Sequence, residues 1–347
     1  MGSTLTVSHK RDVTGVTSRM NLDDSLPAEP PLSIAAYVTF HYVDERLGYL
    51  AQTVRALHGI TSARKDIFIY VNGLDAQRIA AISAALDRAG VRDGVTLRGH
   101  AVRGHPYLLT WAHKPDLREA VLSPNNGYTH FIYVEDDEEL TETQFRYVLD
   151  CLEPLKKRGL VPGFFRTERN AASGTVVATD QERPIDLSTR PYFAVGDRAF
   201  VDLSNPYSGC FVLDRDLARE YVRSISSGLV SSTLRCSWGA RERAAMGLTY
   251  EKAPYPFISR VVHPVDVGTG QPAPEACIRH LPNNYADARD GDAASPPMDR
   301  LFTGKLTKPP FARLLARYTV SRWQTVARFV STAVRNLSAP RHRKIQP

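Results

Sequence analysis

The sequence predicts an α/β fold with a mostly parallel central sheet and helices on both of its faces. Between residues 33 and 102, three runs rich in β-branched and aromatic residues alternate with two segments of helical periodicity. A fourth apolar run, residues 131–134, ends directly in five consecutive acids, Glu135 to Glu139. Strand-helix-strand order gives parallel strands with right-handed crossovers, so the carboxyl ends of these strands meet at one edge of the sheet.

Length and cysteine usage narrow the class of protein. The chain has 347 residues, more than one hydrophobic core usually serves, so we expect a large domain with extensions. Its four cysteines are scattered without a CxxC pair, which argues against a disulfide framework and a cysteine zinc site. No run is long and apolar enough for a membrane span, and the first residues lack a signal-peptide core. We therefore expect a cytoplasmic protein, with peripheral attachment at the inner membrane face as an option.

The net charge of +7 arises from the C-terminal part of the sequence. Residues 301–347 contain ten Lys or Arg and no acid, so the other 300 residues sum to −3. We expect a polar, disordered leader over residues 1–31, a catalytic domain over 32–290, and a linker with a basic helix over 291–347.

Each further element follows from its local pattern. We expect strands over residues 33–41, 66–72, 95–102, 131–134, 160–168 and 206–214. Helices are expected over residues 49–58, 76–89, 117–122, 141–155 and 237–247. Residues 170–198 show no clear pattern and suggest an excursion over an acceptor site.

The acidic run suggests a metal site. Adjacent carboxylates repel one another unless a cation joins them, and Mg²⁺ and Mn²⁺ prefer oxygen ligands, often one or two carboxylates plus substrate phosphates. The simpler alternative is a solvated helix start, because acids favour a helix N-terminus.

The segment Glu135-Asp136-Asp137, placed after two strand-helix units and a connecting helix, resembles the DxD motif of GT-A glycosyltransferases. The resemblance covers about residues 33–285. It implies a GT-A fold in which Asp137, with Glu135 or Asp136 nearby, holds Mn²⁺ or Mg²⁺ against the diphosphate of a nucleotide-sugar. The family frequently adds a late histidine to the metal, which implies His280 here, although a lone histidine is more often structural.

The same resemblance implies where the nucleotide binds. The loop after the first strand and the end of the second strand contact base and ribose in that family, and the matching positions are Thr39, His41, Tyr42, Glu45 and Asn72.

Independently of the family, the basic and aromatic segment 103–114 suits a diphosphate, with Arg103 and Lys114 as the phosphate ligands. The alternative is that Trp111 and Tyr107 in this segment are core aromatics.

The sugar and the acceptor would meet the second half of the domain. Arg166 and Glu168 form a polar pair that can orient sugar hydroxyls, and the resemblance adds a small-residue strand with Ser208 and Gly209. The segment beginning Trp238-Gly239 and containing Glu242 resembles the one that presents an acid in inverting GT-A enzymes. A positioned carboxylate can take the proton of the attacking acceptor hydroxyl, which makes Glu242 the candidate catalytic residue. Trp238 is a candidate contact of the acceptor or the donor sugar. Alternatively, Glu242 only stabilises a helix N-terminus.

Residues 311–337 predict a basic amphipathic helix, with apolar residues recurring at spacings of three and four. Such a helix suits the surface of an anionic membrane. Packing on the catalytic domain is the alternative, and we expect no nucleic-acid partner because no reading motif is present.

The predicted function is a metal-dependent, inverting glycosyltransferase that moves a sugar from a nucleotide-sugar donor to a glycan or lipid-linked acceptor in polysaccharide synthesis. A sugar nucleotidyltransferase is disfavoured, because residues 39–45 contain no glycine-rich phosphate loop. The alternative from another class is a catalytically silent carbohydrate-binding or membrane-associated scaffold with the same fold.

Overall fold

The computed structural model describes residues 31–91, 93–102, 105–286 and 295–320, together with residues 323 and 327. The fold belongs to the compact unit that begins at Leu32. All but one residue of the expected leader lies outside the described residues, as do Arg103 and most of the expected C-terminal helix beyond residue 320. Within the described residues, no helix combines the length and the apolar character needed to cross a bilayer.

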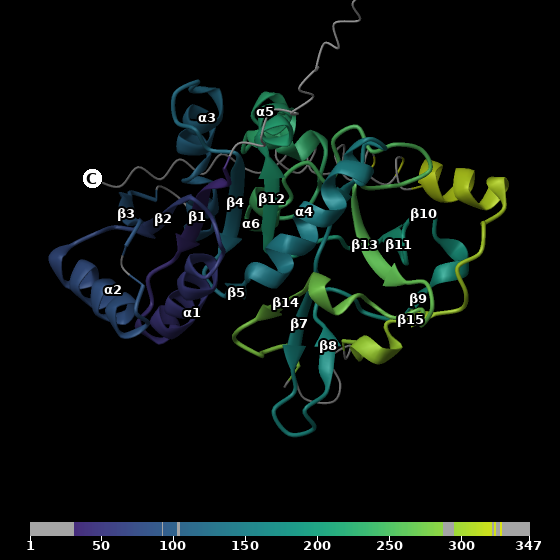
Figure 1. Ribbon diagram of the computed structural model, residues 1–347, viewed down its shortest axis with the longest axis horizontal. Helices are drawn as coiled ribbons and strands as arrows, with labels where there is room; N and C mark the ends of the chain where they lie inside the picture. Colours follow the sequence, from purple (N-terminus) through teal and green to yellow (C-terminus); the bar gives the residue numbers. More distant parts are fainter. Residues whose placement is uncertain are drawn as a thin grey trace, which may run out of the picture. The chain divides into compact units, whose positions relative to one another are not determined.

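A five-stranded, mostly parallel sheet positions the site. Its order is β12-β4-β1-β2-β3, visible from one edge to the other in Figure 1. The four parallel strands are β1 (Ser33–Phe40), β2 (Arg64–Asn72), β3 (Val95–His100) and β4 (His130–Glu135). The edge strand β12 (Cys210–Asp214) runs antiparallel to β4. The predicted α/β class with a mostly parallel sheet is thus confirmed.

Helices cover both faces of this sheet because β1 is apolar on both sides. Ile34, Ala36 and Val38 belong to one buried cluster, whereas Ala35 and Tyr37 belong to another. The first cluster includes residues of α1 (Leu47–His58) and α2 (Ala76–Arg88), and the second includes residues of α3 (Lys114–Leu122) and α5 (Arg215–Arg223). Figure 1 shows the two pairs of helices on opposite sides of the strands.

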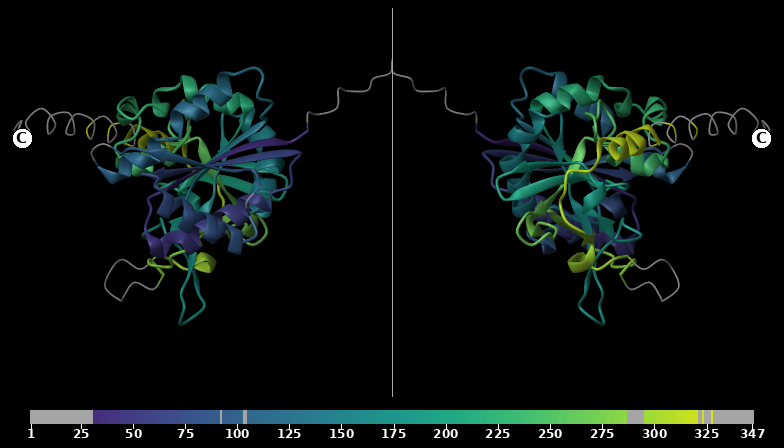
Figure 2. Two further views of the ribbon diagram at one scale, coloured as in Figure 1. Left: turned by 90° about the vertical axis from the view of Figure 1, so that its left-hand side faces the viewer. Right: turned by 90° about the vertical axis from the view of Figure 1, so that its right-hand side faces the viewer.

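The second half of the chain forms smaller sheets. One has the order β10-β11-β13-β6, and it comprises β10 (Tyr192–Val195), β11 (Arg198–Asp202), β13 (Val261–Asp266) and β6 (Val161–Pro162). Another has the order β5-β14-β7-β8, and it comprises β5 (Glu138–Glu139), β14 (Cys277–His280), β7 (Phe165–Arg169) and β8 (Val176–Ala178). The two short strands β9 (Ile185–Asp186) and β15 (Phe302–Thr303) pair with each other. Figure 2 shows the turn between β7 and β8 extending away from these sheets.

One expectation about this half was wrong, and one stretch without a sequence pattern contains short strands. The single strand over residues 160–168 is divided between two sheets at Gly163, where a Cβ would lie 2.4 Å from a methyl carbon of Val261. The patternless stretch 170–198 contains β8, β9 and β10, which are too short to leave a periodic signal. The small helix α6 (Ala240–Ala245) lies inside the expected 237–247 range.

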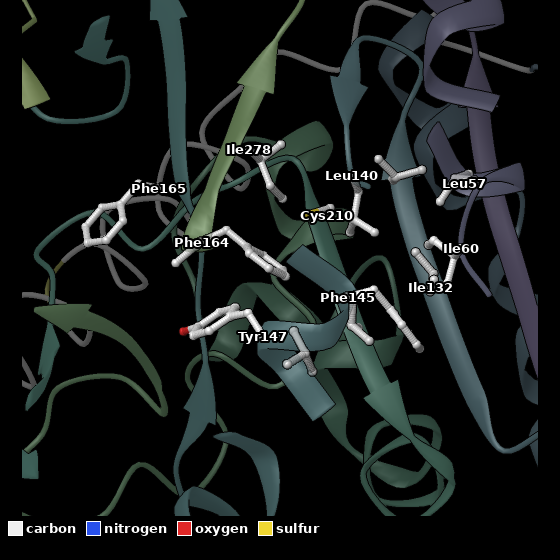
Figure 3. Packing of buried hydrophobic residues seen from close by; sticks show 14 of the residues in the cluster. Leu57, Ile60, Ile132, Leu140, Phe145, Tyr147, Phe164, Phe165, Cys210 and Ile278 are labelled. Atoms are coloured by element: carbon white, nitrogen blue, oxygen red, sulfur yellow. The ribbon is translucent and has the colours of Figure 1, made fainter. Parts of the chain in front are cut away.

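One apolar core joins the two halves. Helix α4 (Glu142–Lys156) lies between them, with Phe145 facing the parallel sheet and Tyr147 facing the second half. Figure 3 shows Phe145 near Ile132 and Leu140, and Tyr147 near Phe164. The ring of Tyr147 meets that of Phe164 edge-on at 5.9 Å between centroids. Because α4 follows the acidic run directly, this packing fixes the position of the acids.

We expect Phe145→Ala to lower the free energy of unfolding by about 3–5 kcal/mol, because it removes a fully buried ring from this shared core. Urea denaturation followed by circular dichroism measures the change. The exposed Asp150 on the same helix is the matched control, and Asp150→Ala should change the free energy by less than about 0.5 kcal/mol. Equal effects of the two substitutions would contradict this description of the core.

Candidate metal centre and adjoining cavity

The acidic run lies at the carboxyl end of β4 and in the turn that leads to β5. Glu135, Asp136, Asp137 and Glu138 are all buried, with at most 6% of each residue exposed, and only Glu139 is half-buried. Helix α4 begins after the run, and Thr141 and Gln144 form its capping box. The alternative of a solvated helix start is therefore wrong for the four buried acids.

Arg46 neutralises two of these acids. Its Nε and Nη2 donate to the two carboxylate oxygens of Asp136 at 2.8 Å each, and Nη2 also donates to Oδ2 of Asp137 at 2.8 Å. The hydroxyl of Thr53 donates to the backbone carbonyl of Asp136 at 3.0 Å. Burial and the neighbouring Asp137 nevertheless raise the pKa of Asp136 to about 7.

The acids on either side of this pair have their own partners. Glu135 accepts a hydrogen bond from the Tyr207 hydroxyl at 2.6 Å and lies 3.3 Å from Nε of Arg241. Glu138 accepts from Nε of Arg166 at 2.6 Å, and burial raises its pKa well above the usual range. Arg166 is itself buried and also contacts Asp180 at 3.1 Å.

His280 reaches the run from β14. Its Nε2 lies 3.3 Å from Oδ2 of Asp137, and its Nδ1 hydrogen-bonds to Glu168. Glu168 is fixed by the backbone N–H groups of residues 285 and 286, which donate to its other oxygen at 2.7 and 2.6 Å. Although burial opposes it, the hydrogen bonds that the ring donates to Asp137 and Glu168 raise the pKa of His280. This carboxylate–histidine pair is the arrangement that orients metal-binding imidazoles in proteins.

Asp137, Glu138 and His280 form a buried cluster that can hold a metal ion, since one ligand atom from each lies within 4.8 Å of the others. Two oxygens here, Oδ1 of Asp137 and Oε2 of Glu138, are buried without a hydrogen-bond partner. Buried carboxylate oxygens without a partner are costly, and a cation would satisfy both. The residues present therefore fit a divalent ion.

The charges of the surrounding network support the same conclusion. Its acidic members are Glu135, Asp136, Asp137, Glu138, Glu168 and Asp180, and its basic members are Arg46, Arg166, Arg241 and His280. With every group ionised, these described residues carry an excess of two negative charges. Burial and the neighbouring Asp137 raise the pKa values of Asp136 and Glu138, so we expect protons to offset this excess when no cation does so.

A cavity of about 370 Å³ opens beside the cluster, at the carboxyl ends of β1 and β4. In α/β folds this edge of the sheet is the usual place for a ligand. The lining residues are Thr39, His41, Val43, Arg46, Pro106, Tyr107, Leu109, Thr110, Glu135, Asp136 and Arg241. Because Arg46 lines the cavity and also binds Asp137, it stands between the cavity and the metal cluster.

Some of the residues expected to bind the nucleotide line the cavity, and others do not. Thr39 and His41 line the cavity, whereas Tyr42 and Glu45 do not. Asn72 accepts a hydrogen bond from the backbone N–H of Tyr42 at 2.6 Å, which holds the loop after β1.

Lys114, expected to bind phosphate, does not line this cavity. Its ammonium group lies about 5 Å from four aromatic ring centroids and donates to the Tyr221 hydroxyl at 2.6 Å and the Ala244 carbonyl at 2.7 Å. Burial lowers its pKa well below the usual range.

The residues expected around the sugar lie near the acids but are mostly engaged within the protein. Arg166 and Glu168 bind Glu138 and His280, as described above. Gly209 has φ +65°, and its carbonyl accepts from the N–H of Glu135 at 3.0 Å. A Cβ at Gly209 would lie 2.8 Å from Oε1 of Glu138, so this position requires glycine.

The three other expected residues are Ser208, Trp238 and Glu242. Ser208 is buried and bonds to the Cys210 carbonyl at 3.3 Å, while the Trp238 ring lies 6.2 Å from that of Tyr207. Glu242 is half-buried at the start of α6, next to the cavity-lining Arg241. Its carboxylate bends back toward Gly239, where an added Cβ would lie 2.3 Å from Oε2.

Sequence reasoning missed Glu138 as a cluster member and Arg46, Arg241, Tyr207 and Asp180 as partners of the acids. The sequence did indicate Glu138 as a candidate ligand, because it belongs to the acidic run. For Arg46 the signal was its position in the loop after a parallel strand, where ligand-binding residues gather. The other three have no local pattern that distinguishes them.

Fold and site together define an α/β protein with a mostly parallel sheet and a buried acidic cluster with one histidine that can hold a metal ion. No protein-family model matches the chain, and no curated protein matches it either.

We expect Mn²⁺ to bind this cluster and Asp137→Asn to weaken the binding by about 100-fold, because the substitution removes a charged ligand. Isothermal titration calorimetry measures the affinity, and a thermal melt checks that the variant is folded. Glu139→Gln is the matched control, since this neighbouring acid points to Arg279 at 3.8 Å and lies outside the cluster. Unchanged affinity in Asp137→Asn would refute the site.

Metal binding should release protons below pH 7. Because the pKa values of the ligands Glu138 and His280 are raised, and that of the adjoining Asp136 is raised to about 7, the free site holds protons at pH 6 that a divalent cation displaces. We expect the affinity for Mn²⁺ to increase about tenfold from pH 6 to pH 7 for each proton displaced. Calorimetry in two buffers of different ionisation enthalpy counts the protons released at each pH. Equal affinity and no release at pH 6 would contradict the charge distribution described above.

Proposed function

We propose that this chain is a metal-dependent glycosyltransferase of the GT-A type, which transfers a sugar from a nucleotide-sugar to an acceptor hydroxyl in glycan or polysaccharide synthesis. The observation that carries the proposal is the contact of one residue, Arg46, with both the open cavity and the buried cluster. A nucleotide-sugar needs this combination, because its base requires a partly apolar pocket and its diphosphate requires positive charge.

The cavity lining contains both kinds of group that such a donor would require. Val43, Pro106, Tyr107 and Leu109 offer apolar and aromatic surface for a base. Arg46 and Arg241 offer guanidinium groups to phosphate oxygens. The volume of about 370 Å³ falls within the range of small-molecule sites.

A divalent ion held by Asp137, Glu138 and His280 would supply the positive charge that stabilises a departing diphosphate. Two carboxylates with one imidazole suit Mn²⁺, which accepts both oxygen and nitrogen ligands, better than Mg²⁺, which favours oxygen alone. Within the chain, Arg46 would exchange part of its contact with Asp136 and Asp137 for the phosphates. Glu168 would keep the His280 imidazole oriented through its Nδ1.

Glu242 is the proposed general base. It lies in the first turn of α6, directly after Arg241, which lines the cavity. An acceptor hydroxyl becomes a competent nucleophile when such a carboxylate takes its proton during attack. This assignment makes the transfer a direct displacement, hence inverting.

The test is donor hydrolysis with a panel of UDP-, GDP- and CMP-sugars, with and without Mn²⁺. We expect one nucleotide class to bind only with Mn²⁺ and to be hydrolysed slowly, and Asp137→Asn to abolish both. Glu242→Gln should retain donor binding and lower turnover by about 10²–10⁴-fold, the usual contribution of a general base. Glu139→Gln again serves as the control.

The outcomes separate the proposal from its alternative. Metal-dependent binding of a sugar or nucleotide with no turnover for any donor or acceptor would favour a catalytically silent binding protein. Neither binding nor hydrolysis by the intact protein would reject the glycosyltransferase.

A further inference from the structure

The C-terminal helix is attached to the domain by one face only. Residues 311–320 are helical, and among them only Leu314, Arg317 and Tyr318 are half-buried. These three lie at spacings of three and four residues and therefore share one side of the helix. The remaining seven residues of the segment are exposed. Figure 1 shows this helix in yellow at one end of the second half of the fold.

A buried ion pair fixes the orientation of the helix. Nη1 of Arg317 lies 2.9 and 3.0 Å from the two carboxylate oxygens of Asp202, a fully buried residue at the end of β11. The ring of Tyr255 meets that of Tyr318 edge-on at 5.3 Å between centroids and that of Phe311 at 6.2 Å. Because a buried charge pair requires close geometry, the helix cannot rotate freely about its axis.

The opposite face is apolar and exposed. Its large side chains are Leu315, Val320 and Trp323, which are 45%, 54% and 68% exposed. The described residues between them on this side are Ala312, Ala316 and Thr319, so no described charge interrupts the face. Phe311, which is 68% exposed, lies at the border of this face, beside the ring of Tyr255. Three large hydrophobic residues on one exposed helix side are unusual for a surface that faces only water.

The chain segment that carries this face has charge of a single sign. Lys305, Lys308 and Arg313 are exposed on this segment, and residues 301–347 contain ten Lys or Arg without any acid. This arrangement disfavours a second copy of the chain as the partner, because two such segments would repel each other. A nucleic acid would match the charge but not the exposed phenylalanine, leucine and valine.

We propose that this helix is a docking surface for an anionic lipid bilayer. The apolar face lies at the boundary of headgroups and acyl chains, where the side chains of Leu315 and Trp323 are favourable, and the lysines and arginines contact anionic headgroups. The pair between Arg317 and Asp202 then holds the whole domain in a fixed orientation on the membrane. This proposal is independent of the reaction, so its failure would leave the glycosyltransferase proposal intact.

The test is co-sedimentation of the full chain with vesicles of phosphatidylcholine, either pure or containing about 30 mol% phosphatidylglycerol. We expect binding to the anionic vesicles, little to the neutral ones, and a marked loss in high salt. The double substitution of Leu315→Ser with Trp323→Ser should weaken binding about tenfold or more, because both apolar side chains leave the interface.

Val230→Ser is the matched control, since Val230 is 79% exposed on a different part of the surface. A thermal melt of each variant checks the fold, which the exposed substitutions should leave unchanged. Failure of the wild type to bind anionic vesicles would overturn the proposal. So would equal binding by the double variant, or a self-association in solution that the double substitution abolishes.

Discussion

The burial of more carboxylates than cations at the end of one strand is the constraint on which the rest of the structure depends. An isolated buried carboxylate is strongly disfavoured, so each must be paired, protonated or joined to a metal. Glu135 and Asp136 are paired with arginines at the cavity wall. Asp137 and Glu138 each retain one buried oxygen without a partner. A cation is the simplest way to satisfy both oxygens at once.

The second half of the fold contributes the basic side chains that the parallel sheet does not bring to the buried acids. The parallel strands end at the cavity, but the imidazole of His280 comes from β14, and the guanidinium of Arg166 comes from β7. These strands pair directly with each other, and β14 pairs with β5, which contains Glu138. The antiparallel pairing of Glu138 with His280 therefore makes their proximity a property of the backbone register.

Much of the parallel sheet could be predicted, because its strands are apolar runs separated by amphipathic helices. The acidic run at the end of β4 could also be recognised in the sequence. The resemblance named Asp137 and His280 as metal ligands, and Oδ2 of Asp137 lies 3.3 Å from Nε2 of His280. The position of Arg46 after β1 indicated a ligand-binding segment, but its pairing with Asp136, 90 residues away, has no local signature in the sequence. Lys114 was expected at a phosphate, but the convergence of α3, α5 and α6 encloses its ammonium group, which sequence periodicity does not reveal.

The most direct measurement is pulsed electron paramagnetic resonance of the full chain loaded with one equivalent of Mn²⁺. We expect ¹⁴N coupling from one directly coordinated imidazole, lost in His280→Gln, and ³¹P coupling when a nucleoside diphosphate is added. A bound Mn²⁺ without nitrogen coupling, or with coupling that persists in His280→Gln, would contradict a metal held between Asp137, Glu138 and His280.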